Sequence, residues 1–168
     1  MTSGVTYEFR VESRNSYDYS APSDVLTLLA AFKPEAPEAP TTTVIANKVK
    51  VSWPNHLTNG SPITGYKVYI LQHDKVTYTQ ESIDCIGTDA SVLANRECLI
   101  KLDTLIVAPY SLVLNEEIWA KVIATNVYGD SPFSAAGNVG LTKLIPDAPI
   151  NLANNAAITD AAKIGLVW

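Results

Sequence analysis

Charge is scarce in this chain, and its distribution excludes whole classes of partner. Only 17% of the 168 residues are charged, the formal net charge is -5, and lysine and arginine are scattered without a run. Nucleic acids and anionic membranes attract proteins through clustered basic side chains. We therefore expect no nucleic-acid partner and no attachment to an anionic membrane surface.

Long hydrophobic runs are also missing. The longest apolar stretches are "VLTLLAAF", which begins at Val25, and "LIVAPYSLVL", which begins at Leu105. A membrane-spanning helix needs about 20 such residues, so we expect no membrane span in this segment. The first residues, "MTSGVTYEFRVES", lack the basic start and apolar stretch of a secretory signal. If the protein is secreted, its signal lies outside this segment.

Helical periodicity is absent, whereas the strand pattern occurs almost everywhere. "TYEFRVES", "NKVKVSW", "GYKVYI" and "IWAKVIAT" alternate with period two, and the breaks between them are rich in Gly, Pro, Asn, Asp and Ser. Short strands at regular spacing with turn residues between them are typical of an antiparallel β-sandwich. The sequence therefore predicts an all-β fold.

The chain repeats itself. "NSYDYSAPS" at residues 15–23 is similar to "NVYGDSPFS" at residues 126–134. "PEAP" at 34–37 recurs as "PDAP" at 146–149, and "KVKVSW" ending at Trp53 recurs as "KIGLVW" ending at Trp168. Such a period indicates tandem copies of one supersecondary unit.

The order of these segments resembles the fibronectin type III family, whose late strand reads Tyr-x-x-x-Val-x-Ala-x-Asn. Tyr7, Val11 and Asn15 fit this pattern early in the chain, and Val122 and Asn126 fit it again later. The resemblance implies the last two strands (F and G) of a partial domain at residues 1–32 and a complete domain at 33–144. It implies the first two strands (A and B) of another partial domain at 145–168.

The complete domain exceeds the usual length of such a sandwich between Tyr69 and Ile118, and this insertion carries the only two cysteines, Cys85 and Cys98. Two buried thiols, a partial metal site and a disulfide are all compatible with the pair. Neither histidine lies at ligand spacing, and a structural zinc site needs four ligands. The even count, the loop-rich context and a fold common at cell surfaces favour a disulfide.

A second departure concerns strand F. The family places the tyrosine of a tyrosine corner where this domain has Ile118. Because strand residues alternate between faces, Trp119 and Ile123 should point outward, beside Tyr69 on the neighbouring strand C. This apolar cluster is the candidate interface. It could be covered by residues 105–114 of its own domain, contact another domain or chain, or serve as a platform for a carbohydrate or small ligand.

Other candidate sites are weaker. His56 and His73 are expected to be surface histidines, and the turn acids are expected to be solvated (Asp84, Asp89, Asp103, Glu116 and Glu117). The sequence contains no nucleophile motif and no phosphate loop, so we expect no enzymatic activity and no cofactor or metal. Asn59 begins a potential N-glycosylation site, "NGS", which also reads as a tight turn. Thr41, Thr42 and Thr43 could carry O-linked sugar or simply form a strand.

Together these features predict an extracellular or cell-surface structural protein, a spacer or building block of a fibre or matrix. The alternative is the adhesive or ligand-binding ectodomain of a receptor. The expected partners are neighbouring domains of the same array or further copies of the chain, end to end, with glycans as a further possibility. The proline-rich segments at 33–40 and 145–149 should act as short, semi-rigid connectors.

Overall fold

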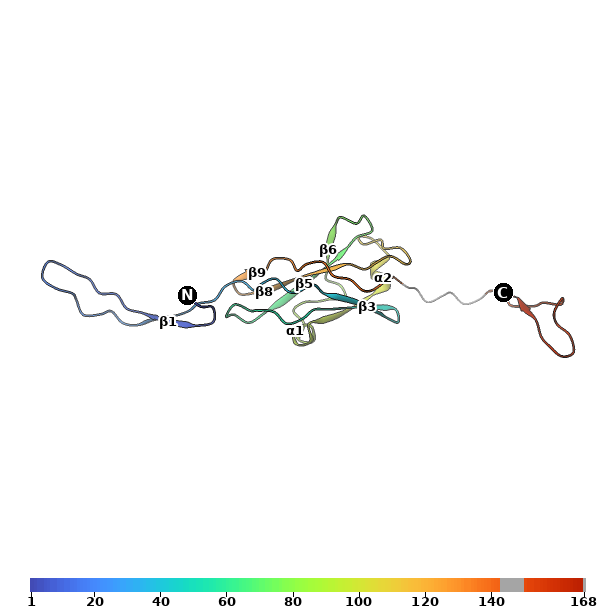
Figure 1. The fold of residues 1–168 in the computed structure, drawn as a ribbon, viewed down its shortest axis with the longest axis horizontal. Helices are drawn as coiled ribbons and strands as arrows, with labels where there is room; N and C mark the ends of the chain where they lie inside the picture. The colour runs from blue at the N-terminus through green and yellow to red at the C-terminus, as the bar shows by residue number, and fades with distance from the viewer. Residues whose placement is uncertain (143–149, 168) are drawn as a thin grey trace.

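In the computed structural model, residues 1–142 and 150–167 are described. Their strands form four antiparallel sheets, two of which face each other in a central sandwich, while the β1–β2 hairpin extends beyond one end of it (Figure 1). The all-β prediction is confirmed. The proline-rich segment at 145–149 lies outside the described residues.

One layer of the sandwich is a three-stranded sheet with the order β3-β4-β7. Its strands are β3 (Thr41–Ile45), β4 (Lys48–Ser52) and β7 (Glu97–Lys101). Tight pairing of β3 with β4 follows from the short connection at Ala46 and Asn47, where Ala46 has a positive φ of 53°. The sheet presents alternate residues of β4 and β7 to the interior, where they are fully buried.

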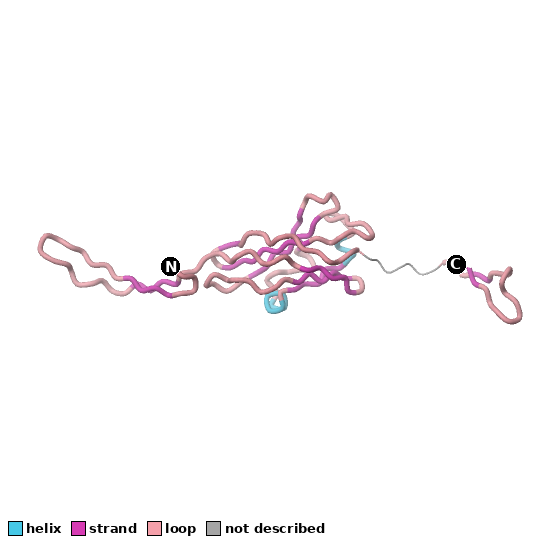
Figure 2. Tube along the Cα trace, viewed as in Figure 1, coloured by secondary structure: helices cyan, strands magenta, loops and turns pink. Residues whose placement is uncertain are grey.

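The other layer has four strands in the order β6-β5-β8-β9. These are β5 (Gly65–Leu71), β6 (Tyr78–Glu81), β8 (Ala120–Asn126) and β9 (Gly129–Asp130). Residues 131–142 continue along β8, but this edge is irregular because Pro132 cannot donate a ladder hydrogen bond. Figure 2 shows the strands concentrated in this central part of the chain.

The core lies between the two layers and follows the alternation that the sequence predicts. Ile118, Ala120, Val122 and Ala124 are each fully buried on or next to β8. They face apolar residues of the opposite sheet, chiefly Val49, Val51 and Ile100. At one end of this core, Trp53 lies edge-on against Tyr66, with their ring centroids 5.0 Å apart.

The insertion contains two short helices that the sequence analysis did not predict. They are α1 (Ala90–Asn95) and α2 (Leu102–Leu105), which lie on either side of β7. Each is too short to show a helical repeat in the sequence. Both are anchored by buried residues, Val92 in α1 and Leu102 with Leu105 in α2.

Each end of the chain is a small two-stranded sheet. At the start β1 (Thr6–Phe9) pairs with β2 (Leu26–Leu29), and at the end β10 (Ala153–Asn154) pairs with β11 (Leu166–Val167). Apolar residues of the first hairpin remain exposed, among them Leu26 at 57% and Leu28 at 50%. A hairpin with such a face is marginal in water by itself.

The sequence repeat is matched by a repeat of hydrogen bonds. The hydroxyls of Ser131 and Ser134 accept the backbone N–H groups of Ala124 and Val122, at 3.0 and 2.9 Å. In the first copy Ser20 and Ser23 accept from Ser13 and Val11 in the same way, at 3.0 and 3.1 Å. In both places each serine N–H still donates to the carbonyl of the same partner residue. The hydroxyl thus stands in for one of the two backbone hydrogen bonds of a strand pair, which explains the recurrence of Ser in the repeated segment.

Candidate functional site

The candidate interface lies on the outer face of the four-stranded sheet. Strand pairing places Tyr69 of β5 opposite Lys121 of β8, and Lys67 opposite Ile123. These residues alternate with core residues such as Tyr66 and Val68, which are 6% and 1% exposed. The register of the sheet therefore places Tyr69 and Ile123 on its outer side, while Trp119 lies just before the start of β8.

The aromatic residues on this face gather around a lysine, and we call Tyr69, Tyr78, Lys121 and Phe133 the outer-face cluster. Tyr69 packs edge-on against Phe133, with ring centroids 4.9 Å apart. The ammonium group of Lys121 lies 4.3 Å from the ring centroid of Tyr78 and 5.8 Å from that of Phe133. A lysine held over aromatic faces gains cation–π energy, so the cluster is partly satisfied within the domain.

The predicted apolar patch is only partly reproduced. Ile123 is 8% exposed and is thus buried rather than available to a partner. Trp119 is half-buried, and its indole nitrogen donates to Glu117 Oε2 at 2.9 Å. Lys121 stands between these two residues along β8, so they do not form a continuous apolar surface. Sequence reasoning also missed Phe133, because it lies on the irregular edge beyond Pro132.

Residues 105–114, which the sequence offers as one possible cover for Trp119, contribute to the core of the sandwich. Within residues 105–114, Leu105, Tyr110 and Leu112 belong to the core of the sandwich. The Tyr110 hydroxyl donates to the Gln80 carbonyl at 3.0 Å. Burial, followed by the charge of Glu81, raises the pKa of Tyr110 to about 12. Tyr110 thus binds the backbone of β6 through its hydroxyl. The domain has Ile118, which cannot form such a bond, where the family places its corner tyrosine.

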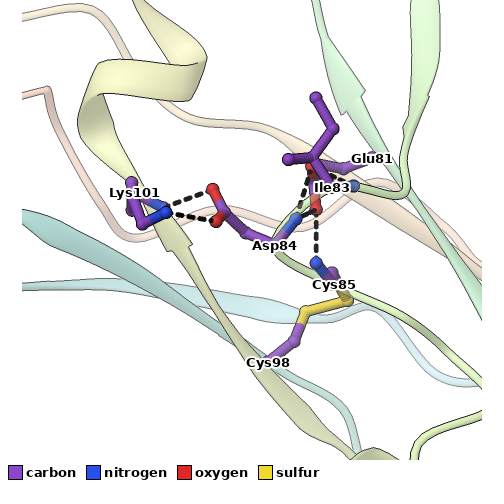
Figure 3. The surroundings of a disulfide bond; sticks show 6 residues. All are labelled: Glu81, Ile83, Asp84, Cys85, Cys98 and Lys101. Carbon is purple, nitrogen blue, oxygen red and sulfur yellow. Dashed lines mark hydrogen bonds and ion pairs between the residues drawn. A yellow bond between two sulfur atoms is a disulfide. The ribbon is translucent and has the colours of Figure 1, made fainter.

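The two cysteines form a disulfide that links the two layers (Figure 3). Cys98 lies on β7 of the three-stranded sheet, and Cys85 lies in the loop that follows β6 of the other sheet, with 5.4 Å between their Cα atoms. Both are buried, Cys85 at 3% and Cys98 at 5% exposure. The bond therefore fastens the insertion to the core.

Two carboxylates order the loop beside the disulfide. Glu81, only 1% exposed, accepts the backbone N–H groups of Ile83, Asp84 and Cys85, the last at 2.7 Å (Figure 3). These backbone N–H groups replace the water molecules that burial removes from the carboxylate.

Asp84 is not the solvated turn acid expected from the sequence. It accepts from the backbone N–H of Lys101 and from the Thr104 hydroxyl, and its carboxylate lies 3.2 Å from Lys101 Nζ. Burial by itself would raise the pKa of Asp84, but the hydrogen bonds from Thr104 and Lys101 outweigh it and lower the pKa. Asp84 thus joins the disulfide loop to the end of β7.

Glu116 also differs from the expectation. Its side chain is 4% exposed and accepts from Lys75 Nζ, from His73 Nδ1 at 3.1 Å and from the Val113 backbone N–H at 2.8 Å. Burial would raise the pKa of Glu116, but these partners, Lys75 first, lower it to about 2. Glu116 thus forms a structural clamp, because its one carboxylate binds the Lys75 and His73 side chains and the Val113 backbone together.

The two histidines differ in environment: His73 is exposed as expected, whereas His56 is half-buried and is not the surface histidine expected from the sequence. The two ring nitrogens of His56 are buried without a hydrogen-bond partner among the described residues, and its ring lies edge-on to Tyr66 with centroids 5.8 Å apart. Burial, followed by the charge of Arg96, lowers the pKa of His56. In the part of the chain that the structure describes, no group of three or more His, Cys, Asp or Glu residues could hold a metal ion.

The glycosylation candidates differ in accessibility. Thr41 and Thr43 are exposed on β3, whereas Thr42 is fully buried. The Thr42 hydroxyl donates to the Ile118 carbonyl and accepts from the N–H groups of Val139 and Gly140. Thr42 is therefore a structural residue of the folded domain, because a sugar there would separate β3 from its neighbours. Asn59 is half-buried, and its side-chain amide donates to the Lys33 carbonyl at 2.8 Å.

No helix among the described residues is long and apolar enough to cross a membrane. No family profile matches the sequence, and the search of curated proteins gave no match.

Solved structures do resemble the fold. A crystal structure of consecutive titin domains aligns with a TM-score of 0.50 and 18% identity, covering 77% of this chain and 38% of the other. Fibronectin domains of chicken contactin align with a TM-score of 0.49 and 19% identity, covering 90% of this chain and 49% of theirs. The chain thus spans less than half of these structures. Its strand order and the similarity to the titin domains show that the chain has a fibronectin type III-like β-sandwich fold.

Proposed function

We propose that the chain is a non-enzymatic, extracellular tandem β-sandwich segment that acts as a spacer or building block of a surface fibre or matrix. The observation that carries the proposal is the position of the two ends of the sandwich. The connector enters beside Asn126, at the end of β8, where the Asn126 side-chain amide donates to the Phe32 carbonyl at 2.7 Å. The chain leaves after Thr142, whose backbone pairs with Glu116 just before β8.

Entry and exit therefore lie at opposite poles, separated by the length of one strand. Seven residues of β8 span about 23 Å, since a strand rises about 3.3 Å per residue. A module with its ends at opposite poles extends a polypeptide when it is repeated. A module with adjacent ends would fold successive copies back on one another.

The two hairpins at the ends fit this organisation as parts of neighbouring sandwiches. In the first hairpin, Tyr7 corresponds to the family's corner tyrosine, and its hydroxyl accepts from the Thr2 backbone N–H at 2.6 Å. Phe9 and Leu26, which pair with each other in this hairpin, are exposed. Such exposure is expected of core residues whose opposite sheet lies outside this segment. Either the polypeptide continues as a covalent array, or chains join head to tail through these faces, which would also give an open filament.

The disulfide supports an extracellular location. Structural disulfides persist in oxidising compartments and are rare in the cytosol. The Cys85–Cys98 bond is buried and lies between two sheets, which is the placement of a structural link rather than an exposed, exchangeable one. This observation concerns the compartment and does not distinguish a fibre from a receptor.

The native material tests the proposal directly. Denaturing mass analysis should give a species far heavier than the 18.1 kDa of this chain if the array is covalent, and electron microscopy should show linear strings of domains. A species near 18 kDa that still forms linear strings would support the non-covalent filament. Compact single particles would refute the spacer function.

The adhesive ectodomain remains the second candidate, and the outer-face cluster favours it. Phe133 is 47% exposed beside Lys121 and Tyr69, which leaves an aromatic edge available for contact. Replacing Trp119 by Ser should leave the domain folded and weaken assembly or adhesion if this face is an interface. Unchanged assembly and adhesion would mean that the face is packed only within its own domain.

A further inference from the structure

The first part of the connector between the β1–β2 hairpin and the sandwich, residues 32–35, is bound to the sandwich. The backbone N–H of Phe32 donates to the Asn59 carbonyl at 3.0 Å, and that of Glu35 donates to the Leu57 carbonyl at 3.2 Å. The side-chain amide of Asn59 returns a hydrogen bond to the Lys33 carbonyl at 2.8 Å. Between these bonds Pro34 is buried. A segment with this many partners is not a free spacer.

Asn126 closes the same connector from the other side. It is 3% exposed at the end of β8, and its Nδ2 donates to the Phe32 carbonyl at 2.7 Å and to the Thr58 carbonyl at 3.4 Å. Its Oδ1 accepts the backbone N–H of Tyr128 at 2.9 Å. One buried side chain thus joins three segments: the connector, the loop before β5 and the turn after β8.

The hairpin itself rests on the turn at Asn59 and Gly60. These residues have φ values of 54° and 81°, as a type I′ turn requires. A Cβ on Gly60 would lie 2.5 Å from the backbone nitrogen of Gly4 and 2.9 Å from the carbonyl oxygen of Ala30. The turn therefore touches the base of the hairpin, backbone against backbone, and no other residue fits at position 60.

We propose that Asn126 and the Asn59–Gly60 turn form an interdomain lock, which holds the preceding sandwich in one fixed direction relative to the next. The inference rests on the tandem organisation of the proposed function and adds the surface by which neighbouring domains recognise each other. The partner of the lock is the connector backbone together with the Gly4 and Ala30 strand ends of the preceding domain. The lock makes the array stiff at this joint.

The lock also predicts whether the potential glycosylation site at Asn59 carries a sugar. An N-linked sugar would be attached to the same Asn59 Nδ2 that donates to Lys33. The sugar would stand against the connector at Lys33. Asn59 is consequently unmodified wherever the lock is closed, and a sugar there would open the joint.

The repeat supplies a matched control. Asn15 occupies the place of Asn126 in the first copy, and its Oδ1 accepts the N–H of Tyr17 at 2.8 Å, as Asn126 does from Tyr128. Asn15 is exposed, and no hydrogen bond from its Nδ2 occurs among the described residues. Asn→Asp at either position keeps the Oδ1 acceptor and removes the donor. Only N126D should affect the joint.

Hydrogen exchange on the full chain tests the lock. In the wild-type chain the Phe32 amide should exchange slowly, and N126D should accelerate it at least tenfold, whereas N15D should leave it unchanged. Relaxation of the β1–β2 amides should show tumbling with the sandwich in the wild type and faster, independent motion in N126D. If N126D unfolds the sandwich, as exchange of the Val122 amide would reveal, N59D removes the neighbouring donor at a half-buried position and should have the same effect.

Equal Phe32 exchange in the wild type and the folded variants would overturn the lock, as would an equal acceleration in N15D. A sugar on Asn59 in the native folded protein would also overturn it. These outcomes are distinct from a failure of the proposed function. Linear strings of domains with a rapidly exchanging Phe32 amide would support the spacer function and refute the lock. Compact particles with a protected Phe32 amide would refute the spacer function and support the lock.

Discussion

Replacing Glu116 with Gln tests whether the carboxylate clamp stabilises the sandwich. The pKa of Glu116 is about 2 in the folded protein and 4.5 as an ordinary glutamate. Each pH unit between the folded and unfolded pKa is worth 1.36 kcal/mol, so the fold favours the charged over the neutral carboxyl by at most about 3 kcal/mol. Because Gln resembles the neutral form, E116Q should lower the free energy of unfolding at pH 7 by up to that amount.

The effect should depend on pH in one direction. A carboxyl whose pKa is depressed by folding contributes stability above its unfolded pKa and loses it as the pH falls through the folded value. The difference between wild type and E116Q should therefore be complete above pH 4.5 and disappear near pH 2. Lys75 and His73 are 53% and 55% exposed, so each regains water when the carboxylate is removed and adds little to the loss.

Urea denaturation followed by tryptophan fluorescence at pH 7, 4 and 2 measures this difference. The neighbouring exposed residue provides the control. Among the described residues, the Glu117 side chain binds the Trp119 indole alone, and E117Q should change stability by less than about 1 kcal/mol. Equal stabilities of E116Q and the wild type at pH 7 would refute the reasoning. So would a difference that is as large at pH 2 as at pH 7.

Three further changes probe the interior. Replacing Cys85 and Cys98 together with Ala should cost about 3 kcal/mol in urea denaturation, the loop-closure value for their separation of 13 residues; stability unaffected by the change would contradict a structural role. Thr42→Val should cost about 2 to 3 kcal/mol because it leaves buried carbonyl and N–H groups unpaired, whereas Thr41→Val on the exposed side should cost less than about 0.5 kcal/mol. Ultraviolet titration should show one tyrosine ionising near pH 12 that is lost in Y110F, and stability should fall between pH 10 and pH 12 because the fold favours neutral Tyr110; a Y110F titration identical to the wild type would exclude this assignment.

The alternation of residues along the strands was readable from the sequence because burial acts on every second side chain. The pattern Ile118, Ala120, Val122, Ala124 was enough to orient β8, and all four are fully buried. The repeated "NVYGDSPFS" segment and the turn at Asn59 were equally visible, since turn chemistry is local. These features determined the fold class and the end-to-end organisation that we propose.

The candidate sites depended on contacts between segments far apart in the chain, which no local pattern contains. Nothing in the sequence around Glu81 and Glu116 marks them as buried. They are buried because hydrogen-bond donors from other residues bind their carboxylates. Phe133 became the aromatic partner of Tyr69 only through the packing of an irregular edge beside β8. The sequence by itself determined which residues could be buried and where the chain turns. Tertiary structure decided which polar groups meet, because burying a charge or an amide is stable only where distant partners complete its hydrogen bonds.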